Sequence, residues 1–94
     1  MSNLIYLQEF YKKHCHKNNF FGVEITTQGA DGWYISIDLF DTPYENIIFN
    51  EIFIKVDDDN WIKCFKDNNV FRATCGVDNL EETLGIFSKW ITNK

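Results

Sequence analysis

Strict alternation of residue types in the middle of the chain is the feature that most limits its possible folds. In the segment Trp33–Leu39 every odd position is apolar, and the even positions hold Tyr34, Ser36 and Asp38. Successive side chains of a β-strand point to opposite faces of the sheet. The pattern therefore predicts a strand with one buried face and one face that carries polar and aromatic groups.

Four more segments carry strand signals and are separated by short turns. They cover residues 21–25, 48–56, 61–66 and 70–75. The predicted turns fall at residues 28–32, 57–60 and 67–69, which are rich in Gly, Asn and Asp, and residues 41–46 form a loop. Connections this short favour an antiparallel meander.

Helical periodicity appears at both ends of the chain. Residues 3 to about 17 place apolar side chains on one stripe, and Ser2 or Asn3 can cap this helix. Near the C-terminus, Asp78 can cap a second helix, and Glu81 lies at the spacing of a capping box.

This order of elements predicts the fold class. We expect an α+β fold with an antiparallel sheet of about five strands and the N- and C-terminal helices packed on one face. The opposite face stays partly open. Residues 1–94 suffice for a single domain.

Charge and composition narrow the possible partners. The formal net charge is −5, which repels nucleic acid and anionic lipid and attracts basic partners. Nine Phe, four Tyr and three Trp exceed what one small core can hide, so some aromatic side chains should be exposed. Three Cys residues, with neither a signal peptide nor a transmembrane segment in the sequence, suggest a cytoplasmic protein with reduced thiols.

Candidate metal and catalytic motifs are weak. His14 and His16 are two positions apart, so on a helix they point apart and cannot share one ion; His14 is then expected at a solvated helix end. Cys64 and Cys75 lie in predicted strands, where a small buried residue is the expected role and a nucleophile is the alternative. We expect no metal, no cofactor and no enzymatic activity.

The acidic run Asp57–Asp59 resembles a calcium loop only superficially. Counted from Asp57, position 6 is Ile62 and position 12 is Asn68, where an EF-hand needs glycine and glutamate. Two interpretations stay open: a solvated turn, or an acidic patch for a basic partner.

The ordered segments Leu7–Tyr11, Gly32–Leu39, Asp58–Cys64 and Asn79–Phe87 together resemble the bacterial family called immunity protein 53, found in polymorphic toxin systems. The resemblance covers nearly the whole chain, although Cys75–Asp78 stands where members often have a glycine-rich turn. It implies a non-enzymatic protein that binds and neutralises a cognate toxin, and it supplies no catalytic residues.

The resulting hypothesis is an immunity protein that acts by stoichiometric binding to a basic toxin, with a nuclease as the default target class. The alternatives are a small thiol enzyme and an adaptor domain for another protein. On alternation alone, the open face and the acidic turn form the predicted binding surface: Tyr34, Asp38, Glu51, Phe53, Asp57, Asp58 and Asp59, with Tyr44 and Phe49 as further candidates.

Overall fold

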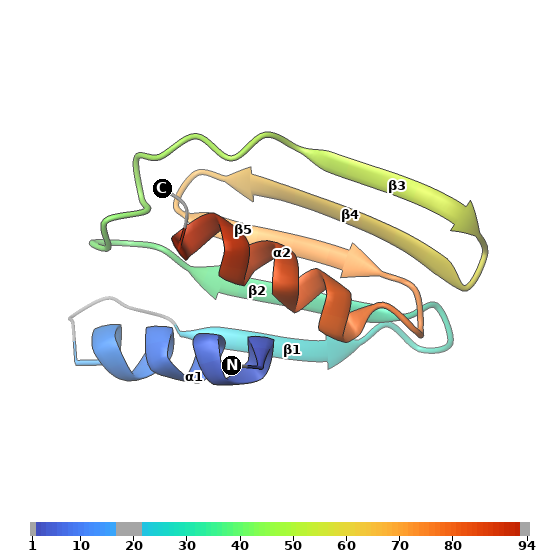
Figure 1. The fold of residues 1–94 in the computed structure, drawn as a ribbon, viewed down its shortest axis with the longest axis horizontal. Helices are drawn as coiled ribbons and strands as arrows, with labels where there is room; N and C mark the ends of the chain where they lie inside the picture. Colours follow the sequence, from blue (N-terminus) through green and yellow to red (C-terminus); the bar gives the residue numbers. More distant parts are fainter. Residues whose placement is uncertain (1, 17–21, 93–94) are drawn as a thin grey trace.

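The computed structural model describes residues 2–16 and 22–92. Within these ranges the elements follow the predicted order of helix, five strands and helix, and the α+β fold class is confirmed (Figure 1). The elements are α1 (Asn3–His14), β1 (Val23–Thr27), β2 (Trp33–Asp38), β3 (Ile52–Asp57), β4 (Asn60–Asp67), β5 (Val70–Cys75) and α2 (Leu80–Thr92).

The five strands form one antiparallel sheet in the order β1-β2-β5-β4-β3. The predicted meander is therefore wrong, because β2 pairs with β5 and not with β3. Burial explains the order. The core-facing residues of β5, Phe71, Ala73 and Cys75, are fully buried, whereas β3 is exposed along most of its length. The strand with the more apolar inner face takes the centre, and β3 takes the edge.

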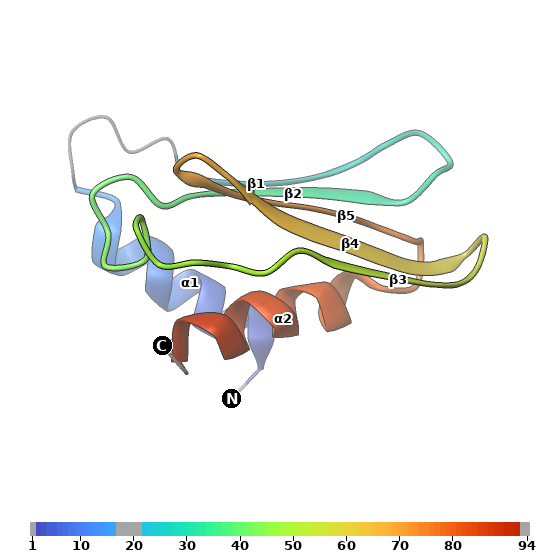
Figure 2. The ribbon, with the colours of Figure 1, turned by 90° about the horizontal axis from the view of Figure 1, so that it is seen from above.

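Both helices cover the same face of the sheet, and no described helix or strand covers the other face (Figure 2). The core lies between the sheet and the helices. Phe71 stands at its centre, with ring centroids 5.1 Å from Phe87 and 5.2 Å from Phe49. The odd residues of β2 face this core as predicted: Ile35 and Ile37 are fully buried, while Trp33 is half-buried at the rim.

The first helix is shorter than predicted. Its N-cap is Ser2, whose Oγ accepts a hydrogen bond from the backbone N–H of Ile5 at 3.2 Å. It ends at His14, and Cys15 is its C-cap. The predicted extension to Lys17 and the first residue of the predicted strand, Phe21, lie outside the described residues.

The second helix begins after Asn79, so the prediction that Asp78 caps it is wrong. Asn79 is almost fully buried, and its side chain joins the helix to the sheet. Its Oδ1 accepts from the Trp61 N–H at 3.2 Å, and its Nδ2 donates to Asn60 Oδ1 at 2.8 Å and Glu82 Oε1 at 3.1 Å. A buried amide with partners in both layers is favoured over an exposed carboxylate at this position.

The third strand begins at Ile52, four residues later than predicted. Residues 48–51 leave the sheet because the preceding segment is attached to the helix side. Lys66 Nζ donates to the carbonyl oxygens of Glu45 and Ile47, and Trp90 Nε1 donates to the carbonyl of Ile48 at 3.3 Å. These bonds hold the long β2–β3 connection across the end of the sheet (Figure 1).

A close approach at Gly76 joins the β5–α2 connection to the turn end of the β3–β4 hairpin. A Cβ atom at this position would lie 2.3 Å from the carbonyl oxygen of Asp59, and the Gly76 N–H donates to the carbonyl of Trp61 at 2.9 Å. Only glycine allows the β5–α2 connection to pass this close to the hairpin backbone.

We predict that Phe71→Ala lowers the free energy of unfolding by about 3–5 kcal/mol, because it removes the ring at the centre of the core. The matched control is Phe53→Ala, since Phe53 is 64% exposed and its loss should change stability by less than about 0.5 kcal/mol. Urea denaturation measures both values. Similar losses for the two variants would contradict the assignment of the faces.

Candidate functional site

The candidate site is the uncovered face of the sheet, which we call the open face. The strand register defines it. Thr26 pairs with Tyr34, Tyr34 with Thr74, Thr74 with Lys63, and Lys63 with Phe53, so these five side chains form one row across all five strands. The next row toward the β2 end contains Glu24, Ser36, Arg72 and Phe65.

Arg72 lies on β5, the central strand of the open face. Its guanidinium donates to the Tyr34 hydroxyl, and its Nε lies 3.5 Å from Asp67 Oδ2. The Arg72 side chain is 35% exposed and that of Asp67 is 53% exposed, so solvent screens the ion pair and its contribution to stability is small. The main effect of the two partners is to fix the orientation of the guanidinium.

Aromatic side chains lie on three strands of the open face, and two of them, Tyr34 and Phe65, are direct neighbours of Arg72. Tyr34 on β2 and Trp61 and Phe65 on β4 are half-buried, and Phe53 on β3 is 64% exposed. Lys63 Nζ lies 5.7 Å from the centroid of the Phe65 ring, within the range of a cation–π contact. The open face thus presents apolar rings with charged groups between them.

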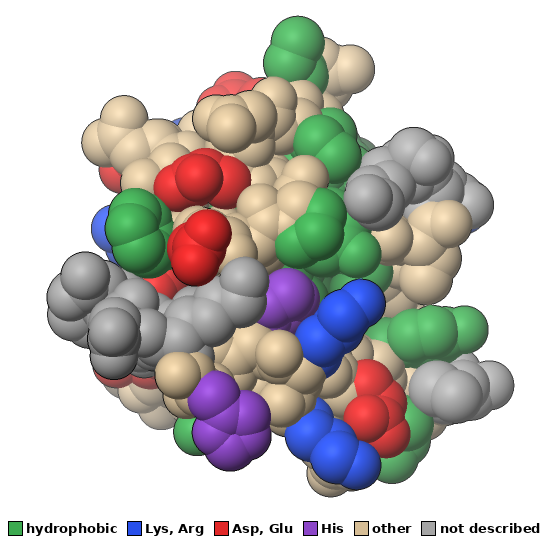
Figure 3. Space-filling model, turned by 90° about the vertical axis from the view of Figure 1, so that its left-hand side faces the viewer, with side chains coloured by type: hydrophobic (Ala, Val, Ile, Leu, Met, Phe, Trp, Pro, Cys, Tyr) green, Lys and Arg blue, Asp and Glu red, His purple; other side chains and the backbone are tan. Residues whose placement is uncertain are grey.

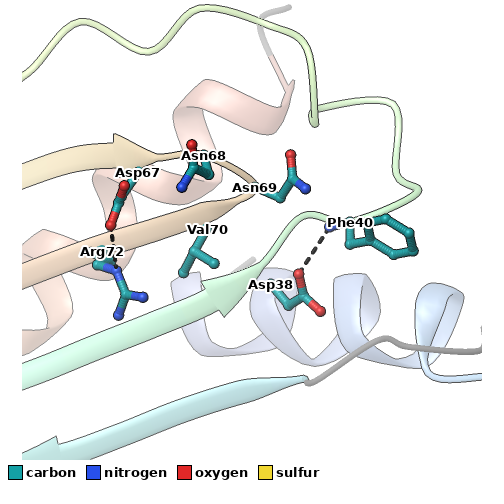
Figure 4. Close-up of a pocket in the computed structure, with 7 residues that line it drawn as sticks. All are labelled: Asp38, Phe40, Asp67, Asn68, Asn69, Val70 and Arg72. Atoms are coloured by element: carbon teal, nitrogen blue, oxygen red, sulfur yellow. Dashed lines mark hydrogen bonds and ion pairs between the residues drawn. The ribbon is translucent and has the colours of Figure 1, made fainter.

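A groove of about 470 Å³ hollows the end of this face where β2 stops. Its walls are the end of β2, the β4–β5 turn and Arg72 (Figure 4). Asp38 is only 5% exposed, and its Oδ1 accepts from the Phe40 N–H at 3.0 Å. Asp38 therefore shapes the chain turn that borders the groove. Figure 3 shows this end of the molecule, where acidic side chains gather on one side and a further acidic side chain lies among the basic ones on the other.

The acidic turn forms the tip of the β3–β4 hairpin at the other end of the sheet. Asp57 pairs with Asn60, so the turn itself consists of Asp58 and Asp59. Asp57 Oδ1 accepts from the Asp59 N–H at 2.9 Å, and Lys55 Nζ lies 3.6 Å from Asp58 Oδ1. All of these side chains are exposed. The tip is therefore an ordered, solvated group of carboxylates.

The seven predicted site residues do not form one cluster. Tyr34 and Phe53 lie in the same row of the open face, and Glu51 is exposed directly before β3. Asp38 lies at one end of the sheet and the Asp57–Asp59 tip at the other. The further candidates Tyr44 and Phe49 pack on the helix side, with ring centroids 5.9 Å and 5.3 Å from Trp90.

Sequence reasoning missed three residues of the open face: Trp61, Phe65 and Arg72. The signal was present for the first two, because alternation along the predicted strand puts Ile62 and Cys64 on one face and therefore Trp61 and Phe65 on the other. Arg72 could not be found this way, since its importance depends on the pairing of β5 with β2, which places it beside Tyr34.

The buried cysteines do not resemble a catalytic site. Burial raises the pKa of the Cys64 thiol to about 12, with a smaller contribution from Cys75, and burial is also the largest cause that raises the pKa of the Cys75 thiol. Both thiols therefore stay protonated at neutral pH, whereas a nucleophile needs the thiolate.

His14 is buried, 3% exposed, and packs against Phe10 with ring centroids 4.7 Å apart. The expectation of a solvated helix end was wrong for His14, because His14 lies on the buried side of α1 with Leu7 and Phe10, while His16 is exposed. Among the described residues no three His, Cys, Asp or Glu side chains converge as metal ligands.

Neither described helix is long and apolar enough to span a membrane.

Fold and surface together define a small α+β protein whose sheet is covered by helices on one side and presents its other side to the surroundings. The chain belongs to the immunity protein 53 family, whose model matches residues 4–92. The resemblance inferred from the sequence is thus confirmed, and the family indicates a role in immunity to a toxin. Comparison with curated proteins and with solved structures gives no significant match.

We predict that a thiol reagent at neutral pH modifies Cys15 in the native protein and leaves Cys64 and Cys75 unmodified. Cys15 is partly exposed, whereas the other two thiols are buried and protonated, so their reaction should be slower by about 100-fold or more. Mass spectrometry counts the adducts, and the same labelling in urea provides the control in which all three cysteines react. Fast native labelling of Cys64 or Cys75 would favour the thiol enzyme.

Proposed function

We propose that this chain neutralises a cognate toxin by forming a stoichiometric complex with it, and that the open face of the sheet binds the toxin. One observation carries the proposal: the face that the helices leave uncovered presents Arg72 beside Tyr34 and Phe65, with Trp61 farther along the same face. Arg, Tyr and Trp are the residue types that most often dominate the binding energy of protein interfaces.

The packing of the open face favours binding. Arg72 is already oriented by Tyr34 and Asp67, so little side-chain entropy is lost when a partner covers it. The half-buried rings of Trp61 and Phe65 are likewise restrained by their neighbours in the sheet. A specific complex buries about 1,200–2,000 Å² in total over both partners, of which this five-stranded face has to supply about half.

The negative net charge of this chain supports the proposal that its toxin partner is basic. The net charge of −5 attracts positively charged proteins over long distances, and the carboxylates of the hairpin tip are solvated and free of burial. Nucleases carry basic surfaces because they bind phosphate backbones, so a nuclease is the toxin class that this charge fits best. We place the complex in the bacterial cytoplasm, as part of a polymorphic toxin system.

The two alternative functions have less support. A thiol enzyme needs an accessible thiolate, and Cys64 and Cys75 are buried with raised pKa values. An adaptor domain would use the same open face, so the difference lies in the partner. An immunity gene should follow a toxin gene, whereas an adaptor gene need not.

The first experiment is co-expression with the protein encoded immediately upstream. We expect the chain to restore growth and to co-purify with that protein in a one-to-one complex. Light scattering on the purified complex gives the stoichiometry. A toxic neighbour that is neither bound nor neutralised would refute the proposal, and a harmless neighbour that binds would support the adaptor instead.

The open face can be tested with the double variant Tyr34→Ala and Arg72→Ala. We expect its Kd for the toxin to rise by about 30-fold or more, since central Tyr and Arg residues each contribute around 2 kcal/mol to a typical interface. The control is Leu4→Ala on α1, which removes a 56% exposed apolar side chain from the helix side and should leave Kd unchanged. Equal increases in Kd for the double variant and for Leu4→Ala would exclude the open face as the toxin-binding surface.

The acidic tip can be tested with Asp58→Asn and Asp59→Asn, which keep the Asp57 carboxylate that closes the turn. We expect the association rate at low salt to fall by about two- to tenfold and its salt dependence to flatten, because steering depends on these charges. The matched control, Glu9→Gln with Glu81→Gln, removes two exposed carboxylates from the helices. If the control lowers the rate equally, only the net charge matters and the tip has no specific role.

A further inference from the structure

The outer edge of β3 is the least protected part of the described sheet. In the described residues β3 pairs only with β4, so its other edge carries unpaired backbone N–H and C=O groups. Three apolar side chains of this strand are strongly exposed: Phe53 at 64%, Ile54 at 49% and Val56 at 70%. An edge with free backbone groups and apolar side chains is a template for a further strand.

The opposite edge of the sheet differs. β1 exposes Glu24, Thr26 and Thr27, and its apolar residues Val23 and Ile25 are half-buried. Helix α1 lies next to this side of the sheet, whereas no described helix lies beyond the outer edge of β3 (Figures 1 and 2). The two edges have the same backbone chemistry, and only the β3 edge adds exposed apolar side chains to it.

The apolar side chains of β3 project on both faces of the sheet. Phe53 pairs with Lys63 and belongs to the open face, while Ile54 pairs with Ile62 and belongs to the helix side. A flat protein surface would cover only one of them. An extended strand paired to the edge places its own alternate side chains beside both.

Two features limit how a strand can pair here. The register shifts between Lys55 and Asp57, so the regular part of the edge is Ile52–Lys55. Lys55 adds a charge that discourages unspecific pairing of apolar strands, although its Nζ is 3.6 Å from Asp58. The pairing edge is therefore short, and Lys55 disfavours unspecific pairing. Both features favour a specific partner strand.

Charge identifies the kind of strand that fits. Acidic residues flank the regular segment, with Glu51 before it and Asp57, Asp58 and Asp59 after it, all exposed. A second copy of this chain would bring its own Glu51 and acidic tip against these carboxylates, and like charges opposite each other in a sheet are unfavourable. A strand with apolar residues at its centre and Lys or Arg at its ends is complementary.

We infer that the free edge of β3 pairs with an extended, basic-flanked strand of the toxin, so that the toxin extends the sheet and its adjoining surface covers the open face. The inference rests on the proposed function. Phe53 connects the two parts, because it belongs both to β3 and to the row of the open face that contains Tyr34.

Amide hydrogen exchange measured by NMR tests the backbone pairing. In the free protein, the β3 amides that face away from β4 should exchange quickly. In the complex with the toxin encoded upstream, we expect alternate amides of Ile52–Lys55 to slow by about tenfold or more, with the amides of the β1 edge unchanged. If a complex forms and the β3 amides keep their free rates, the edge pairing is wrong, while the proposed function stands.

Two other outcomes also decide against the inference. If β3 amides slow in the protein alone, and more so at higher concentration, the edge pairs with a second copy. If the chain neither restores growth nor co-purifies with the toxin, the proposed function is refuted, and the inference, which rests on it, is refuted as well.

A pair of variants tests the side chains of the edge. Ile54→Lys places a charge inside the regular segment, against the apolar centre of the partner strand, and we expect Kd to rise by about tenfold or more. Thr27→Lys makes the same change in charge at an exposed residue of β1 and should alter Kd by less than about twofold. Equal changes would show that charge alone is responsible and would overturn the strand pairing.

Discussion

The pairing of β2 with β5 is the interaction on which the rest of the structure depends. It places Ile37 beside Phe71 and Ile35 beside Ala73, all four fully buried, in the middle of the sheet. Burying these side chains contributes about 25 cal/mol for each Å² of apolar surface that leaves water. The pairing also requires the long connection after β2 to cross the end of the sheet, which sends β3 to the outer edge and leaves it with a single neighbour.

The uncovered surface follows from this arrangement. Two helices are enough to cover the apolar side of the central strands, and among the described elements none remains for the opposite side (Figure 2). That side therefore collects the even residues of β2 and the odd residues of β4, which include the aromatic groups around Arg72. In an immunity protein, such a face offers a rigid surface for a partner, since every side chain on it stands on a paired strand or hairpin.

Local sequence patterns predicted much of the fold. Alternation located β2, β4 and β5, and Asn68 at φ 55° occupies the turn that was predicted between the last two strands. The errors arose where long-range contacts compete with local preference. Residues 48–51 alternate like a strand, but hydrogen bonds from Lys66 and Trp90 hold the adjoining segment on the helix side. Asp78 is a good cap in isolation, but the buried Asn79 binds both layers.

The sequence by itself determined the class of fold, the order of its elements, the acidic charge and the family, because these depend on residue types and on short-range spacing. Only the tertiary structure decided the strand order, the grouping of Arg72 with Tyr34 and Asp67, and the separation of Asp38 from the acidic tip. The physical reason is that alternation tells which residues share a face of one strand, whereas which strands become neighbours depends on how the whole chain buries its apolar surface.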